Sequence, residues 1–152
     1  MPYVALSYVW GDPTVTKDIF LDDCVFPVTT NLEAVLRSLR NTVDILWVDA
    51  ICVNQNDLKE REHQVQQMQS IYGAAKEVIA WLGIPGKNTN LAMDEISRSR
   101  ATPFHTDPFT GQPEEAIQAV CGFIEILCRP WFRRIWVCLY SVHCWQANAA
   151  QR

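Results

Sequence analysis

Residues 46–83 read LWVDAICVNQNDLKEREHQVQQMQSIYGAAKEVIAWLG, and this stretch decides the fold of the chain. The apolar run over residues 44–49 predicts a buried strand, and residues 57–75 then predict a long helix. Residues 78–82 predict a second buried strand. A strand, a helix and a second strand in this order form a βαβ unit, which joins two parallel strands of one sheet.

Local signals outside this stretch predict the remaining elements. Residues 4–9 predict a strand that ends in a turn at residues 10–13. The pattern Thr30-Asn31-Leu32-Glu33 predicts that Thr30 caps a helix, and Asp57-Leu58-Lys59-Glu60 has the same capping-box pattern. The other expected elements are a hairpin with strands at 18–21 and 24–27, helices at 31–40, 90–100 and 113–127, an exposed loop at 101–113 and an aromatic, β-prone segment at 131–137.

Apolar periodicity predicts which helix faces are buried. These positions are Leu58, Val65, Met68, Tyr72 and Ala75 in the long helix, Leu91 and Ile96 in the next, and Ile117, Val120, Cys121, Ile124 and Leu127 in the last. Helices that alternate with buried strands are typical of the α/β class. We therefore expect a three-layer α/β fold with a mostly parallel central sheet and helices on both faces.

Composition excludes several classes of function. With 152 residues the chain is long enough for one domain with a substantial core. Its net charge of −4 argues against a nucleic-acid partner, which would require a basic surface. No apolar run is long enough to span a membrane, and no basic segment resembling a secretory signal begins the chain. Six cysteines without CxxC spacing indicate reduced thiols, so we expect a cytoplasmic protein without a metal site.

Polar residues gather where the predicted strands end. In open α/β sheets, ligands bind beyond the carboxyl ends of the strands. Each candidate also has a purely structural explanation. Residues 10–12 would form a tight turn, and Asp49, Asn54 and Gln55 would bond to loop backbone. Arg61 and Gln64 would lie on a solvated helix face. The candidate ligand-binding residues are Trp10, Gly11, Asp12, Asp49, Asn54, Gln55, Arg61 and Gln64.

Three sequence blocks resemble the heterokaryon incompatibility (HET) domain of filamentous fungi. The first block is Ala5-Leu6-Ser7-Tyr8-Val9-Trp10-Gly11-Asp12. The second runs from Leu46 through the motif WVDAICVNQ to Gly83, and the third is Arg129-Pro130-Trp131-Phe132-Arg133-Arg134-Ile135-Trp136-Val137. The resemblance covers residues 3–137, so we expect a HET domain over residues 1–137 with a loop insertion at about residues 84–113.

The resemblance implies a cell-death effector that acts in the cytoplasm after non-self recognition. It also implies distant kinship with TIR domains and hence a flavodoxin-like fold. Some TIR domains cleave NAD with a glutamate on a helix that follows a strand, and Glu60 matches that description. On this reading Glu60 is the catalytic residue, NAD is a substrate and no cofactor is required. The structural alternative for Glu60 is its place in the capping box.

The resemblance leaves three functional readings open. In the first the domain is an enzyme, and in the second it is a non-enzymatic scaffold that self-associates as a homo-oligomer. Its expected partners are other HET-type or incompatibility proteins. The third reading follows from residues 138–152, where the family pattern continues with Gln-Glu but this chain has Cys138-Leu139. We expect this tail to be non-homologous, which would make the chain a truncated, inactive fragment.

Overall fold

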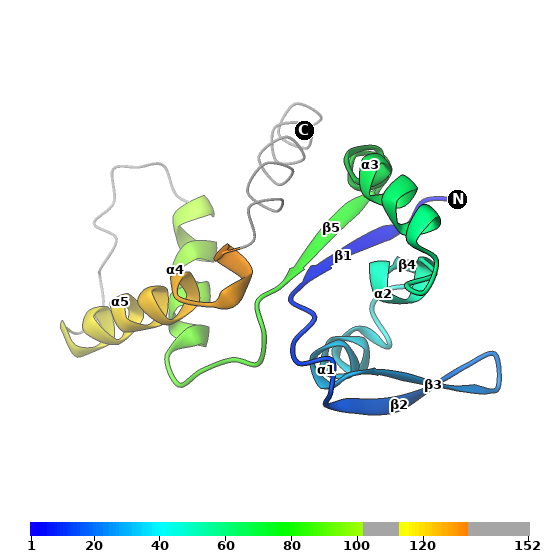
Figure 1. Cartoon of the computed structure of the whole chain (residues 1–152). Helices are drawn as coiled ribbons and strands as arrows, with labels where there is room; N and C mark the ends of the chain where they lie inside the picture. Colours follow the sequence, from blue (N-terminus) through cyan, green and yellow to red (C-terminus); the bar gives the residue numbers. More distant parts are fainter. Residues whose placement is uncertain (102–112, 134–152) are drawn as a thin grey trace.

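The computed structural model describes residues 1–101 and 113–133. Three parallel strands form the sheet, and a separate two-stranded antiparallel hairpin packs against the first helix (Figure 1). The strands are β1 (Val4–Tyr8), β2 (Thr16–Leu21), β3 (Cys24–Thr29), β4 (Leu46–Trp47) and β5 (Glu77–Trp81). The helices are α1 (Thr30–Leu39), α2 (Asp49–Cys52), α3 (Leu58–Ala74), α4 (Thr89–Ala101) and α5 (Pro113–Leu127), followed by the 3₁₀ helix η1 (Pro130–Arg133).

The strand order is β4-β1-β5, so the first strand in the chain lies at the centre of the sheet. Val4 and Ala5 pair with Leu46 and Trp47 on one side, and β1 pairs with β5 along its whole length on the other. This is the order with which flavodoxin-like folds begin. The predicted α/β class with a parallel central sheet is therefore confirmed.

Both faces of β1 are buried, because α1 and α3 lie on opposite sides of the sheet (Figure 1). On one face Leu6 and Tyr8 pack with Leu32 and Val35 of α1 in the main core. The pairing register places Ala5, Ser7 and Trp47 on the other face. There Trp47 meets Tyr72 of α3 edge to face, with 5.8 Å between ring centroids. Four consecutive β1 residues, Ala5 to Tyr8, are each at most 5% exposed, as expected for a strand covered on both sides.

The hairpin turn follows directly from its two aspartates. Asp22 and Asp23 have positive φ values of 48° and 63°. Two central residues in this conformation match the right-handed twist of the flanking strands, and Asp tolerates it better than most residues. Phe20 therefore pairs with Val25, and the predicted hairpin forms with longer strands than expected.

Three predictions about element boundaries are wrong. The strand predicted at 44–49 is reduced to Leu46–Trp47, because Asp49 begins the short helix α2. Thr29, not Thr30, caps α1, since its hydroxyl accepts from the Leu32 N–H while the Thr30 N–H bonds to the carbonyl of Val15. Residues 131–133 lie in η1 instead of a strand, and residues 134–137 lie outside the described part of the chain.

Several predicted buried faces are also wrong. Leu58 and Val65 on α3 are exposed, and Ile96 on α4 is exposed while Ala92 and Glu95 are buried. Met68 and Tyr72 are half-buried as predicted, and Glu60, Gln64 and Ile71 complete the half-buried face of α3 in place of Leu58 and Val65. Tyr72 fixes this rotation, because its ring packs on Trp47 and its hydroxyl donates to the Leu6 carbonyl at 3.0 Å.

Candidate functional site

Trp10 and Asp49 meet at the carboxyl ends of β1 and β4. The indole N–H of Trp10 donates to Asp49 Oδ2 at 3.0 Å, and both residues are half-buried. Gln55 adds to this corner, because its side-chain amide donates to the backbone carbonyls of Asp49 at 2.8 Å and Val53 at 3.2 Å. Trp10 is distant in the sequence from Asp49 and Gln55, and the three candidate residues form one hydrogen-bonded cluster.

Glu60 lies in the first turn of α3, where its carboxylate holds the preceding loop. Oε1 accepts from the backbone N–H of Asn54 at 3.1 Å. A capping box would instead direct this carboxylate to the N–H of the cap residue, Asp57. Asp57 does cap the helix, because its Oδ1 accepts from the N–H groups of Lys59 and Glu60. The Glu60 carboxylate therefore reaches farther back and ties the loop to the helix.

Asn54 has a second local role. Its Oδ1 accepts from the N–H of Asn56 at 3.1 Å, which makes a turn that leads into α3. The Asn54 side chain is exposed, while Gln55 is half-buried. The loop between α2 and α3 is therefore shaped by its own amides and by Glu60 together.

Asp12 closes the turn after β1. Its Oδ1 accepts from the N–H of Thr14 at 2.9 Å and from the Thr14 hydroxyl at 2.7 Å. These two hydrogen bonds, first the one from the hydroxyl, lower the pKa of the Asp12 carboxyl. Gly11 beside it has a φ of 82°, a conformation that favours glycine. Both residues are exposed at the edge of the corner formed by Trp10 and Asp49.

Arg61 and Gln64 differ in how they lie on α3. Arg61 is exposed, whereas Gln64 is half-buried one turn after Glu60. Glu60 and Gln64 therefore share the helix face that turns toward the sheet, and Arg61 lies on the solvated side. Among the described residues, no group of three His, Cys, Asp or Glu side chains is placed to hold a metal ion.

A second cluster lies beyond the carboxyl ends of β1 and β5, and the sequence interpretation missed it. Asn31 of α1 donates from its amide to the carbonyl of Val9 and accepts from the indole N–H of Trp81 at 3.2 Å. In flavodoxin-like sheets the ligand crevice opens between these two strands. Gly83, whose φ is 100°, follows β5 as Gly11 follows β1, and this repeated strand-to-glycine pattern was the available signal.

Arg129 and Trp131 fasten the end of the described chain to this region. Arg129 donates to the carbonyl of Leu82 at 2.8 Å and to the hydroxyl of Thr89 at 3.2 Å. The buried indole of Trp131 donates to Ser7 Oγ at 3.1 Å. The third sequence block therefore supports the sheet and the loop after β5.

Comparison with known proteins now identifies the family. The family model described as heterokaryon incompatibility protein (HET) matches residues 3–138. The chain belongs to the HET family. The match extends from β1 to beyond η1, so it includes both clusters described above.

A curated relative agrees with this membership. Heterokaryon incompatibility protein 6, OR allele, of Neurospora crassa is 37% identical to this HET domain over 110 residues. The aligned region covers 62% of this chain and 16% of the relative, so the chain spans a small part of that protein's length. No solved structure matches the chain. No helix in residues 1–101 or 113–133 has the length and apolar character to cross a membrane.

Proposed function

We propose that this HET domain acts in the cytoplasm as a signalling module of fungal heterokaryon incompatibility and commits the cell to death after non-self recognition. Membership of the HET family supports this proposal, as does the similarity to heterokaryon incompatibility protein 6 of Neurospora crassa. The relative is much longer, so its other regions are proposed to supply recognition while the segment that matches this chain signals.

We further propose that the domain signals by cleaving NAD at the corner of Trp10, Asp49 and Glu60. The observation that supports this mechanism is the position of Glu60. Glu60 is half-buried, one of its carboxylate oxygens is anchored by the Asn54 N–H, and it lies in the first turn of α3, which follows β4 and α2. A fixed carboxylate there can stabilise positive charge that develops on a bound sugar.

The proposed reaction is hydrolysis of an N-glycosidic bond. Water adds to C1′ of the ribose while the bond from C1′ to the nicotinamide nitrogen breaks. The electron pair of that bond leaves with nicotinamide, which becomes neutral, and the products are nicotinamide, ADP-ribose and a proton. Glu60 would act on the oxocarbenium-like ribose, and Asn54 and Gln55 would shape the loop around it.

The test is NAD consumption by the purified chain, measured beside Glu60→Gln and Glu62→Gln. Glutamine keeps an oxygen that can accept from the Asn54 N–H, so the first variant should fold while losing the negative charge. Removal of one group that stabilises transition-state charge typically costs about 10²–10³-fold in rate. We expect such a loss in Glu60→Gln and an unchanged rate in Glu62→Gln, because Glu62 lies on the exposed side of the same helix. Equal rates in all three proteins would overturn the assignment of Glu60.

A second candidate function is a scaffold that signals by assembly without catalysis. It is favoured by the internal bonding of the candidate site, since Trp10, Asp12, Asp49, Asn54, Gln55 and Glu60 each have a protein partner. Such bonds are sufficient to explain the corner as loop structure. A folded chain that assembles and consumes no NAD at high concentration would establish this alternative over the enzyme.

A further inference from the structure

Helix α5 buries the face on which its smallest residues lie. Ala119 and Ile126 are each 5% exposed, and Gly122 between them approaches α4 closely. A Cβ atom added at Gly122 would lie 2.2 Å from the carbonyl oxygen of Asn88 and 2.9 Å from Cβ of Ala92. The absence of a side chain at Gly122 therefore allows this contact, which fixes the rotation of α5 about its axis.

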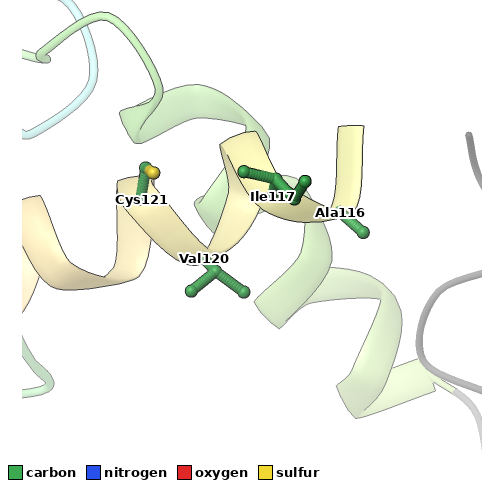
Figure 2. Close-up of a pocket in the computed structure, with 4 residues that line it drawn as sticks. All are labelled: Ala116, Ile117, Val120 and Cys121. Carbon is green, nitrogen blue, oxygen red and sulfur yellow. The ribbon is translucent and has the colours of Figure 1, made fainter. Parts of the chain in front are cut away.

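The opposite face of α5 is apolar and exposed. Ile117, Val120, Ile124 and Leu127 are between 45% and 64% exposed, although the sequence pattern predicted them as a buried stripe. We call these four residues the α5 stripe. A shallow hollow at its N-terminal half is lined by Ala116, Ile117, Val120 and Cys121 (Figure 2).

The α5 stripe has the spacing of the contact positions in a coiled coil. Its residues are separated by three, four and three positions, which are the a and d positions of two heptads. Stripes of this kind pack against another helix, with side chains of one inserting between those of the other. A contiguous exposed patch of large aliphatic side chains is unusual on a surface that contacts only water.

Charged residues near the two ends of α5 indicate which helix would pack against the α5 stripe. Glu114 and Glu115 are exposed in the first turn of α5, and Arg133 is exposed in η1, six residues after α5 ends at Leu127. A second copy of the same helix in the antiparallel direction would bring each acidic end toward the end of its partner that leads into η1 and Arg133. The opposed helix dipoles favour the same direction.

We propose that the α5 stripe pairs with the α5 stripe of a second copy of this chain, antiparallel and about a two-fold axis. With the axis at the level of Gly122, Ile117 lies opposite Leu127 of the partner, and Val120 lies opposite Ile124 of the partner. The pattern is thus self-complementary, as an interface between identical subunits requires. A helix of fifteen residues is about 22 Å long, so the interface is small and the dimer is reversible.

This inference deepens the scaffold candidate by naming its surface, and it does not depend on NAD cleavage. The two proposals fail separately, because Glu60→Gln reports on chemistry and the α5 variants report on molecular mass. Loss of dimer with unchanged NAD consumption would leave the enzyme proposal intact, and the reverse result would leave the dimer intact.

The test is a charge exchange in the full chain, followed by sedimentation over a wide concentration range. One variant carries Glu114→Lys with Glu115→Lys, and the other carries Arg133→Glu. Each variant alone places like charges at both ends of the pair, so we expect each to remain monomeric at concentrations where the wild type dimerises. An equimolar mixture pairs opposite charges at both ends, and we expect it to restore the dimer.

Two further variants test the apolar centre. Ile124→Asp should abolish the dimer, and mixing should not rescue it, whereas Ile84→Asp should leave the dimer unchanged. Ile84 is 74% exposed in the loop after β5 and is the matched control. Far-UV circular dichroism checks that each variant folds. A wild type that is monomeric throughout, a dimer that survives Ile124→Asp, or a mixture that does not reassociate would each overturn the proposal.

Discussion

The indole N–H of Trp10 donates a 3.0 Å hydrogen bond to Asp49 Oδ2, which joins the loop after β1 to the first turn of α2. The two residues are separated by 38 others in the chain, yet they close the carboxyl ends of two neighbouring strands. The bond therefore determines the shape of the corner in which NAD cleavage is proposed.

We expect Trp10→Phe to lower the free energy of unfolding by about 1–2 kcal/mol, because it removes a hydrogen bond to a charged group that is only half-buried. Urea denaturation measures this change. In an Asp49→Ala background, Trp10→Phe should lower the free energy of unfolding by less. The difference, which is the coupling energy between the two sites, should be about 1 kcal/mol. Strictly additive effects would show that the bond contributes nothing to stability.

Asn31→Ala should destabilise the fold by about 2 kcal/mol, since it leaves the carbonyl of Val9 and the indole N–H of Trp81 without their partner. Asn31→Asp keeps an oxygen that accepts from Trp81 but replaces the donor to Val9 with a carboxylate oxygen, which repels the Val9 carbonyl. We therefore expect Asn31→Asp to be no more stable than Asn31→Ala in urea denaturation. Equal stability of all three proteins would contradict a structural role for Asn31.

Replacing Gly122 and Gly73 with alanine should change the stability of the protein in opposite directions. Gly122→Ala forces a Cβ atom against the Asn88 carbonyl, and we expect a loss of about 1–3 kcal/mol from overpacking. Gly73 on α3 has nothing within 4 Å of an added Cβ atom. Gly73→Ala should therefore stabilise the protein by about 0.5–1 kcal/mol through helix propensity. Thermal unfolding of both variants checks the pair, and the same sign for both changes would refute the close approach at Gly122.

Glu33 should make the free energy of unfolding depend on pH in the acid range. Hydrogen bonds from Arg37, and next from Lys17, lower the pKa of the Glu33 carboxyl. The folded state then holds the proton less tightly than the unfolded chain, whose glutamate pKa is about 4.3. The resulting stabilisation is complete above that value and is lost as the pH falls below it through the lowered pKa.

The measurement is thermal unfolding of the wild type and Glu33→Gln between about pH 5 and pH 2. Glu33→Gln lacks this titration, so its stability should fall less over that interval than that of the wild type. Glu62→Gln, at an exposed site on α3, is the control and should follow the wild type. Parallel curves for the wild type and Glu33→Gln would contradict the prediction.

Local signals in the sequence predicted most elements because each signal acts within a few residues. Asp22 and Asp23 adopt the turn conformation that forms the hairpin, and Asp57 caps α3 as its position indicated. The predicted cluster was partly recovered as well, since Trp10, Asp49 and Gln55 do meet. Polar residues that follow predicted parallel strands were expected to lie close together, because such strands bring their carboxyl ends to one edge of the sheet.

The sequence interpretation missed Asn31, Trp81 and Arg129 because their partners are distant and are mostly backbone carbonyls. Asn31 bonds across the gap between β1 and β5, and Arg129 reaches the carbonyl of Leu82 from beyond α5. No spacing rule in one chain reports such contacts. The same reason explains why the carboxylate of Glu60 bonds to Asn54 instead of to its capping-box partner.

The residue order by itself determined the βαβ unit, the hairpin, the limits of α5 and the heptad spacing of its apolar residues, because these depend on backbone preferences and periodicity within a single segment. Only the tertiary structure decided which apolar side chains of α3, α4 and α5 are buried. On α5 the small residues Ala119 and Gly122 allow a close approach to α4, and the large aliphatic side chains of the α5 stripe are turned outward as a result. Periodicity identifies an apolar face, but the closest achievable packing determines whether that face meets the core or remains exposed.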